Sequence, residues 1–184
     1  LAGAATVRGG KLDLAGFRAN AVEADVELGR ADPQSLEGRV FLKGLAFGPV
    51  QIGTVHGKST GTVVDHTIRV LLEAREGKAE AALRGRYEKA AWKGTLDALK
   101  GSDAVGAWGL QAPASLVVSA ERVSAGPVLI AGSAGETLDF SMDVSGDPGR
   151  GVLFAKWQKV NLARFAFLLP DWRIRGLTNG HFRA

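Results

Sequence analysis

Cysteine is absent from this chain of 184 residues, and several other residue types are scarce. Without cysteine the chain has no disulfide framework, no thiol nucleophile and no thiolate metal site. Histidine occurs 3 times, and tyrosine and methionine occur once each. Because the one methionine is Met142, we expect the chain to be a processed product or a segment excised from a longer protein.

Long hydrophobic runs are also missing. The longest wholly apolar run is 165–169, and a membrane-spanning helix needs roughly 20 apolar residues. We therefore expect this segment itself to be soluble, even if the full-length protein is anchored in a membrane.

Neither sign of charge dominates. The 23 basic and 19 acidic residues are interspersed and leave a net charge of +4. Only Arg84-Gly85-Arg86 and Arg173-Ile174-Arg175 are locally basic, and neither makes the clustered patch that nucleic-acid binding needs. We expect no nucleic-acid partner.

Alternation of apolar and polar residues is the strongest pattern that is present, and it is clearest between His66 and Tyr87. Ile68, Val70 and Leu72 occupy every second position, as on one face of a strand. After a break near position 76 the alternation resumes through a second strand. The pattern predicts a β-hairpin whose apolar side chains share one face.

The register of this hairpin has two solutions. A two-residue turn at Glu76-Gly77 pairs position 74 with 79 and position 70 with 83, which keeps the apolar residues together. This register also sets Glu73 against Glu80, which is unfavourable. A bulge or a slip of two residues is the alternative, because a slip of one residue would mix the faces.

Further alternating segments, separated by many of the 25 glycines, predict an all-β chain. We expect one short amphipathic helix, capped by Asn161 and ended by Pro170. No linker divides the sequence, so we expect one continuous unit over 1–184, and a barrel, a sandwich or an open curved sheet would all fit. The expected strands are 12–14, 21–28, 36–47, 50–55, 62–74, 78–87, 91–99, 107–112, 115–120, 122–124, 128–131, 137–145, 151–160 and 172–182.

Candidate chemistry is weak. Gly57-Lys58-Ser59 is similar to the end of a phosphate-binding loop, but the spacing from Gly53 is one residue short and no helix follows, so a β-turn is expected. His56 and His66 are ten residues apart, and no tight spacing of His, Asp and Glu predicts a metal site. No Gly-x-Ser-x-Gly elbow is present. We expect no catalytic residues, no cofactor and no bound metal, and so no enzyme.

A family resemblance begins at Trp92. The segments Trp92-Lys-Gly-Thr-Leu-Asp-Ala-Leu99 and Gly106-Ala-Trp-Gly-Leu-Gln-Ala-Pro-Ala-Ser-Leu116 resemble the TamB family of the translocation and assembly module. The similarity continues through Val160-Asn-Leu-Ala-Arg-Phe165 and Arg175-Gly-Leu-Thr-Asn-Gly180, a phrase found more loosely in AsmA-like proteins. It covers about residues 36–184.

The resemblance implies a β-taco, a long twisted U-shaped sheet with an apolar groove. Members of this family are anchored in the inner membrane and extend across the periplasm. The resemblance further implies partnership with an outer-membrane barrel of the TamA class, through the full-length protein. The implied roles are outer-membrane protein assembly and phospholipid transfer between the two membranes.

Three interpretations of the apolar stripes remain open. They form the dry core of a sandwich, a conduit for phospholipid acyl chains, or a scaffold for strands of unfolded outer-membrane protein such as an autotransporter. Small residues are common in the stripes, which favours a cavity over a filled core. The residues predicted to line such a groove are Ile68, Val70, Leu72, Ala81, Leu83, Leu96, Leu116, Val118, Ile130, Leu138, Phe140, Met142 and Val144.

Overall fold

The computed structural model of the chain describes residues 3–14, 17–29, 35–47, 50–62, 64–146, 150–164 and 175–184. In these ranges nearly every residue outside the turns is in a β-strand, as the alternation predicts. The strands are β1 (Gly3–Gly9), β2 (Leu12–Leu14), β3 (Phe17–Ala19), β4 (Ala21–Leu28), β5 (Ser35–Phe47), β6 (Val50–Thr62), β7 (His66–Ala74), β8 (Gly77–Glu88), β9 (Ala91–Asp103), β10 (Gly106–Leu110), β11 (Ala114–Ser119), β12 (Arg122–Gly132), β13 (Thr137–Ser145), β14 (Gly151–Asn161) and β15 (Leu177–Arg183).

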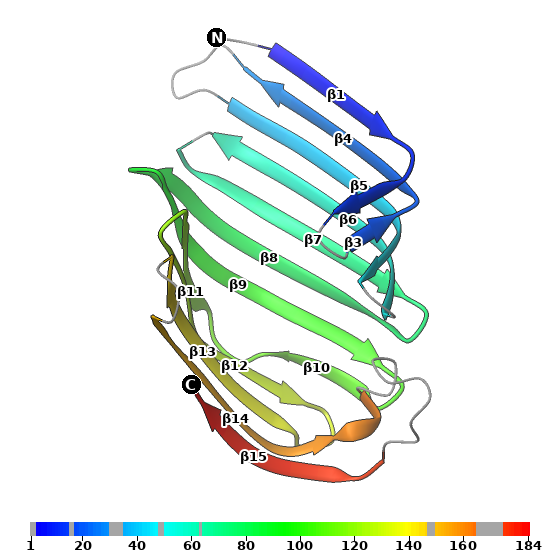
Figure 1. The fold of residues 1–184 in the computed structure, drawn as a ribbon, viewed down its shortest axis with the longest axis vertical. Helices are drawn as coiled ribbons and strands as arrows, with labels where there is room; N and C mark the ends of the chain where they lie inside the picture. The colour runs from blue at the N-terminus through cyan, green and yellow to red at the C-terminus, as the bar shows by residue number, and fades with distance from the viewer. Residues whose placement is uncertain are drawn as a thin grey trace.

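These strands form one antiparallel sheet in the described part of the chain (Figure 1). Its main path runs β1-β4-β5-β6-β7-β8-β9-β10-β12-β13-β14-β15, so most neighbours in space are neighbours in sequence. The long strands β9 and β12 are joined twice, by β10 along one half and by β11 along the other. Likewise β5 pairs with β4 along most of its length and with β3 at its end.

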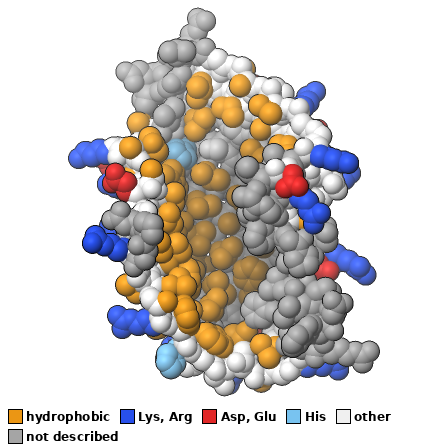
Figure 2. Space-filling model, viewed as in Figure 1, with side chains coloured by type: hydrophobic (Ala, Val, Ile, Leu, Met, Phe, Trp, Pro, Cys, Tyr) orange, Lys and Arg blue, Asp and Glu red, His pale blue; other side chains and the backbone are white. Residues whose placement is uncertain are grey.

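The sheet has no second layer in the described residues, because each strand makes its contacts chiefly with its hydrogen-bonded neighbours. Few side chains are therefore buried. Among the apolar ones only Ala19, Ala46, Ala114 and Val128 are, and no large side chain in the described residues is fully enclosed. Figure 2 shows a hollowed face lined by hydrophobic side chains, with Lys and Arg gathered around its rim.

The hairpin between β7 and β8 takes the alternative register. Ala74 pairs with Gly77, so the turn is Arg75-Glu76 and the strands are shifted by two residues from the Glu76-Gly77 arrangement. The shift keeps the apolar residues on one face and sets Glu73 opposite Lys78 instead of Glu80. Relief of like-charge pairing explains the choice between two registers that the hydrophobic pattern alone leaves equal.

Several expected boundaries are wrong. Gly57-Lys58-Ser59 is not a turn but lies inside β6, where Gly57 pairs with Val40 and Val70. The expected separate strands 122–124 and 128–131 are one strand, β12, with an irregularity beside the cis Gly126–Pro127 bond. β1 and β3 were not expected, because their short runs of Gly, Ala and Arg carry little alternation.

The expected helix at 161–169 is described only at its start. Residues 162–164 form a short 3₁₀ turn, and the Asn161 Oδ1 accepts a hydrogen bond from the Ala163 N–H at 3.0 Å, as an N-cap does. Residues 165–170 lie outside the described residues. The described residues contain no α-helix.

Candidate binding groove

The predicted groove residues lie on one face of the sheet, which we call the inner face. Cross-strand pairing aligns them in rows that run from strand to strand across the sheet. One row carries Ile68, Leu83 and Leu96 on β7, β8 and β9, and the next carries Val70 and Ala81. Leu72 lies on the same face of β7, opposite Ala79. The remaining predicted residues continue this face across β11, β12 and β13: Leu116, Val118, Ile130, Leu138, Phe140, Met142 and Val144.

Tryptophans of the inner face cover glycines on neighbouring strands. The indole of Trp92 lies over Gly85, and a side chain added at that glycine would collide with the ring. Trp108 lies over Gly101 in the same way, and Trp157 over Gly180. Because glycine leaves room for a flat ring against the sheet, these pairs compensate for the missing side chains.

His66 is buried on the inner face and bonded to Trp92. The Trp92 Nε1–H donates to the His66 Nε2 at 2.9 Å, across the intervening strand β8. An indole can only donate, so the Nε2 is the acceptor and the Nδ1–H donates to the Thr62 carbonyl oxygen at 3.3 Å. These two hydrogen bonds specify the tautomer with the hydrogen on Nδ1.

The three histidines do not converge. His56 pairs with Leu71 on the opposite, outer face and stacks on Phe41 with ring centroids 4.7 Å apart. His181 pairs with Lys156, also away from the inner face. In the part of the chain that the structure describes, no group of three His, Asp or Glu side chains could hold a metal ion.

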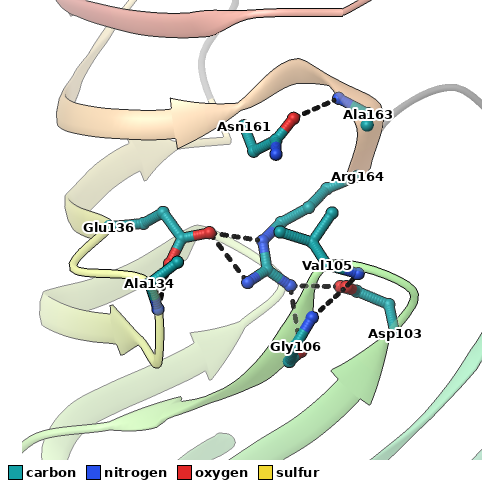
Figure 3. Close-up of polar contacts among 8 residues, drawn as sticks. All are labelled: Asp103, Val105, Gly106, Ala134, Glu136, Asn161, Ala163 and Arg164. Atoms are coloured by element: carbon teal, nitrogen blue, oxygen red, sulfur yellow. Dashed lines mark hydrogen bonds and ion pairs between the residues drawn. The ribbon is translucent and has the colours of Figure 1, made fainter.

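An ion-pair cluster ties three segments together at one end of the inner face (Figure 3). Arg164, on the turn after β14, donates its Nε–H and Nη2–H to the Glu136 Oε1 at 3.2 and 2.9 Å. Its Nη1 bonds to the Asp103 Oδ2 and to the Gly106 carbonyl oxygen, the latter at 3.2 Å. The side chains of Arg164, Asp103 and Glu136 are only 12%, 21% and 6% exposed. We call these three residues the Arg164 clasp.

Both carboxylates of the clasp have further partners. The Asp103 Oδ1 accepts from the backbone N–H groups of Val105 and Gly106 at 2.8 and 3.3 Å. The Glu136 Oε2 accepts from the Ala134 N–H at 3.1 Å. Gly132 leaves the space that this carboxylate fills, because a side chain there would collide with Glu136. The clasp is thus a fully bonded cluster of one cation and two anions.

The clasp changes the acidity of its members. Burial by itself raises the pKa of Glu136, but hydrogen bonds from Arg164 and the backbone, together with the charge of Arg164, outweigh it. The net pKa of Glu136 therefore lies below its ordinary value. Burial by itself lowers the pKa of Arg164, but hydrogen bonds to Glu136 and Asp103 and the charges of these carboxylates outweigh it. The net pKa of Arg164 therefore lies above its ordinary value, and the guanidinium stays charged.

A pocket of about 620 Å³ lies beside the clasp. Its lining is mainly apolar, and the apolar side chains come from four strands and the turn that carries Arg164: Trp108, Ile130, Leu138, Trp157, Val160 and Leu162. Of these only Ile130 and Leu138 were predicted as groove residues. The alternation pattern does not predict Trp108 and Trp157 as lining residues, although a glycine pairs with each of them on the neighbouring strand.

The opposite end of the inner face is open. Val118, Val123 and Val144 lie in one cross-strand row there and are 47%, 37% and 41% exposed. Close by, on the outer face, Arg122 forms a two-point pair with Asp143 at 2.7 and 2.6 Å. Hydrogen bonding and charge raise the pKa of Arg122 and lower that of Asp143, although both side chains face solvent.

The outer face also has a hollow, of about 620 Å³. Phe41, His56 and Leu71 form one cross-strand row in it, next to a row that contains Lys58 and Arg69. Its lining mixes acidic, basic and apolar side chains, in contrast to the apolar inner face.

Comparison with protein-family models, curated proteins and solved structures found no match to the chain. Among the described residues, no helix has the length and apolar character needed to cross a membrane.

Proposed function

We propose that the chain is a periplasmic segment of a TamB-like envelope protein and that its inner face carries phospholipid acyl chains between the inner and outer membranes. The observation that supports this is a continuous apolar face that no described element covers. Covering an apolar face of this kind with hydrocarbon instead of water is favourable, because it removes apolar surface from water. Each methylene removed from water contributes about 0.8 kcal/mol.

In this proposal the curved sheet is a stretch of β-taco, and the full-length protein is anchored in the inner membrane and works with an outer-membrane barrel of the TamA class. Apolar rows such as Ile68-Leu83-Leu96 repeat from strand to strand with few polar groups between them. A uniform lining lets a chain slide, since every position along it offers similar contacts. The role is one of binding and passage, without a chemical step.

In-cell photo-crosslinking tests the proposal with matched pairs of positions. A photoreactive residue at Val70 or Phe140, on the inner face, should yield lipid adducts. The same residue at Leu71 or Leu129, which are exposed on the outer face, should not. Equal lipid labelling from both faces, or none from the inner face, would refute the conduit.

A charge placed in the groove should obstruct passage. Leu72→Arg and Leu83→Glu set a charge on the inner face, whereas Leu71→Arg sets one on the outer face of the same strand. We expect the first two to impair lipid transfer between the membranes and Leu71→Arg to leave it intact. Normal transfer in Leu72→Arg cells would count against the conduit.

A second function has support from the sheet edges. In the described residues β1 pairs only with β4, and β15 only with β14, so each leaves one row of backbone groups without a strand partner. Such an edge can pair with an extended segment of unfolded outer-membrane protein. Crosslinks from edge positions such as Thr6 or Asn179 to polypeptide, with none to lipid at Val70, would favour this scaffold.

A further inference from the structure

We propose that the pocket beside the Arg164 clasp is a discrete site for the end of a single acyl chain, a place where a chain in the groove comes to rest. This inference depends on the proposed function for the chemistry of its ligand. It goes further because a conduit by itself needs only a uniform lining.

The shape of the pocket supports a bounded site. Ile130, Leu138 and Trp157 form one cross-strand row on β12, β13 and β14, and Trp108 comes from β10 on the other side of β12. Val160 and Leu162 complete the lining where β14 passes into the turn. The volume of about 620 Å³ falls in the range of about 300–1,000 Å³ that is typical of small-ligand pockets.

The buried polar groups in the lining are already engaged in hydrogen bonds. Arg164 bonds to Glu136, Asp103 and a backbone carbonyl. The Trp157 Nε1–H donates to the Thr178 Oγ1 at 3.4 Å. No buried side-chain nitrogen or oxygen in the described ranges lacks a hydrogen-bond partner. The buried polar groups of the pocket thus already have partners, and an entering headgroup would lose its hydration with little compensation from them.

The charge of the clasp orients the ligand. Two carboxylates and one guanidinium give the cluster a formal charge of −1. A phosphate or a fatty-acid carboxylate is disfavoured next to it, so the hydrocarbon end enters the pocket and the anionic end stays in the open part of the groove. The occupant is thus the methyl end of an acyl chain.

Tryptophan quenching can locate the chain. The probe is phosphatidylcholine that carries a dibrominated stearoyl chain, because bromine quenches an indole that it touches. Two variants of the chain, each with the other three tryptophans changed to Phe, retain only Trp157 in the pocket or only Trp92 near the open end. We expect saturable quenching of Trp157 at about one lipid per chain and much weaker quenching of Trp92.

A second test fills the pocket with a larger side chain. Val160→Phe should weaken binding of the probe about tenfold, the loss expected for roughly two methylene contacts. Val152→Phe, the same change on the exposed outer face of β14, should leave the affinity unchanged. If Val160→Phe does not fold, Leu162→Gln, on the turn outside the strands, should weaken probe binding independently. Circular dichroism with thermal melting reports whether each variant folds.

The outcomes separate the two proposals. Equal quenching of Trp92 and Trp157 by several lipids per chain, unchanged in Val160→Phe, would overturn the discrete site and leave the conduit standing. Absence of quenching at both tryptophans at every lipid concentration would overturn both.

Discussion

The two ends of the inner face share the long strands β9, β12, β13 and β14 but differ in the side chains that line them. At the closed end two tryptophans line the pocket, and the buried Arg164 clasp joins the end of β9, the turn before β13 and the turn after β14. At the open end, Val118, Val123 and Val144 are more than a third exposed, and the nearby ion pair of Arg122 lies in solvent on the outer face. Both ends contain an arginine paired with carboxylate groups, yet only Arg164 and its two partners are buried.

The difference shows which contacts, besides strand pairing, hold a single sheet without a covering layer in its curved shape. Hydrogen bonds between strands fix the sheet itself, but they do not fix its curvature. The clasp joins segments that are 28 and 61 residues apart in the sequence, so it restrains the closed end in a way that no strand pair does at the open end. We expect stability to depend on the closed end and access to the groove on the open end.

The largest effect is expected for Arg164→Met. Removal of the guanidinium leaves the buried Glu136 carboxylate without its cation, and loss of one partner from a buried pair costs about 3–5 kcal/mol. Chemical denaturation measures the change in the free energy of unfolding. Arg122→Met is the matched control at the open end, where the pair is exposed and water replaces the lost partner. Equal losses in the two variants would show that the clasp does not distinguish the ends.

Acid should weaken the closed end through Glu136. Its pKa in the folded chain lies below the ordinary value of 4.5, so the unfolded chain takes up the proton more readily. The stabilisation is fully present above pH 4.5 and is lost as the pH falls through the lower pKa of the folded state. Denaturation between neutral and acidic pH should show this slope, and Glu136→Gln should flatten it.

Salt provides the comparison with the open end. Asp143 also has a lowered pKa, owing to its hydrogen bond with Arg122, and it contributes in the same acidic range. At about 1 M salt the Debye length falls to about 3 Å, which screens an exposed pair far more than a buried one. The acid dependence that persists in high salt should belong to Glu136, and its loss would argue that the clasp is hydrated.

The sequence predicts the two faces of the sheet well, but it does not predict how the two ends differ. Alternation identified the inner-face residues, since side chains of a strand point to the two faces in turn. It left the β7–β8 register open, and the pairing of Glu73 with Lys78 shows that charge decided it. The clasp was not predicted, because Asp103, Glu136 and Arg164 are polar residues at turns, where solvent is the usual environment. Only the folded sheet brings these three residues together.

A smaller effect is expected at His66, near the open end. Its Nε2 is the acceptor for the Trp92 Nε1–H, so His66→Leu leaves that donor unpaired at a cost of about 1–2 kcal/mol. His66→Gln retains an acceptor and should recover part of the loss. Urea denaturation, with Trp92 fluorescence as the probe, measures both. If Gln and Leu are equally destabilising, packing of the imidazole rather than its hydrogen bond holds Trp92 in place.

The smallest effect is expected for Val144→Lys, at the open end. Val144 is 41% exposed, so a lysine there can lay its methylenes along the groove and hold its ammonium group in water. The free energy of unfolding should change by no more than about 0.5 kcal/mol. Leu138→Lys makes the same kind of change on the same strand, but at the pocket, where the ammonium would lose its hydration and would compete with Arg164 for the clasp carboxylates. Thermal melting of the two variants should therefore separate them clearly. If the two variants have the same melting temperature, the pocket is as exposed to solvent as the open end, and the apolar face is a uniform groove along its whole length.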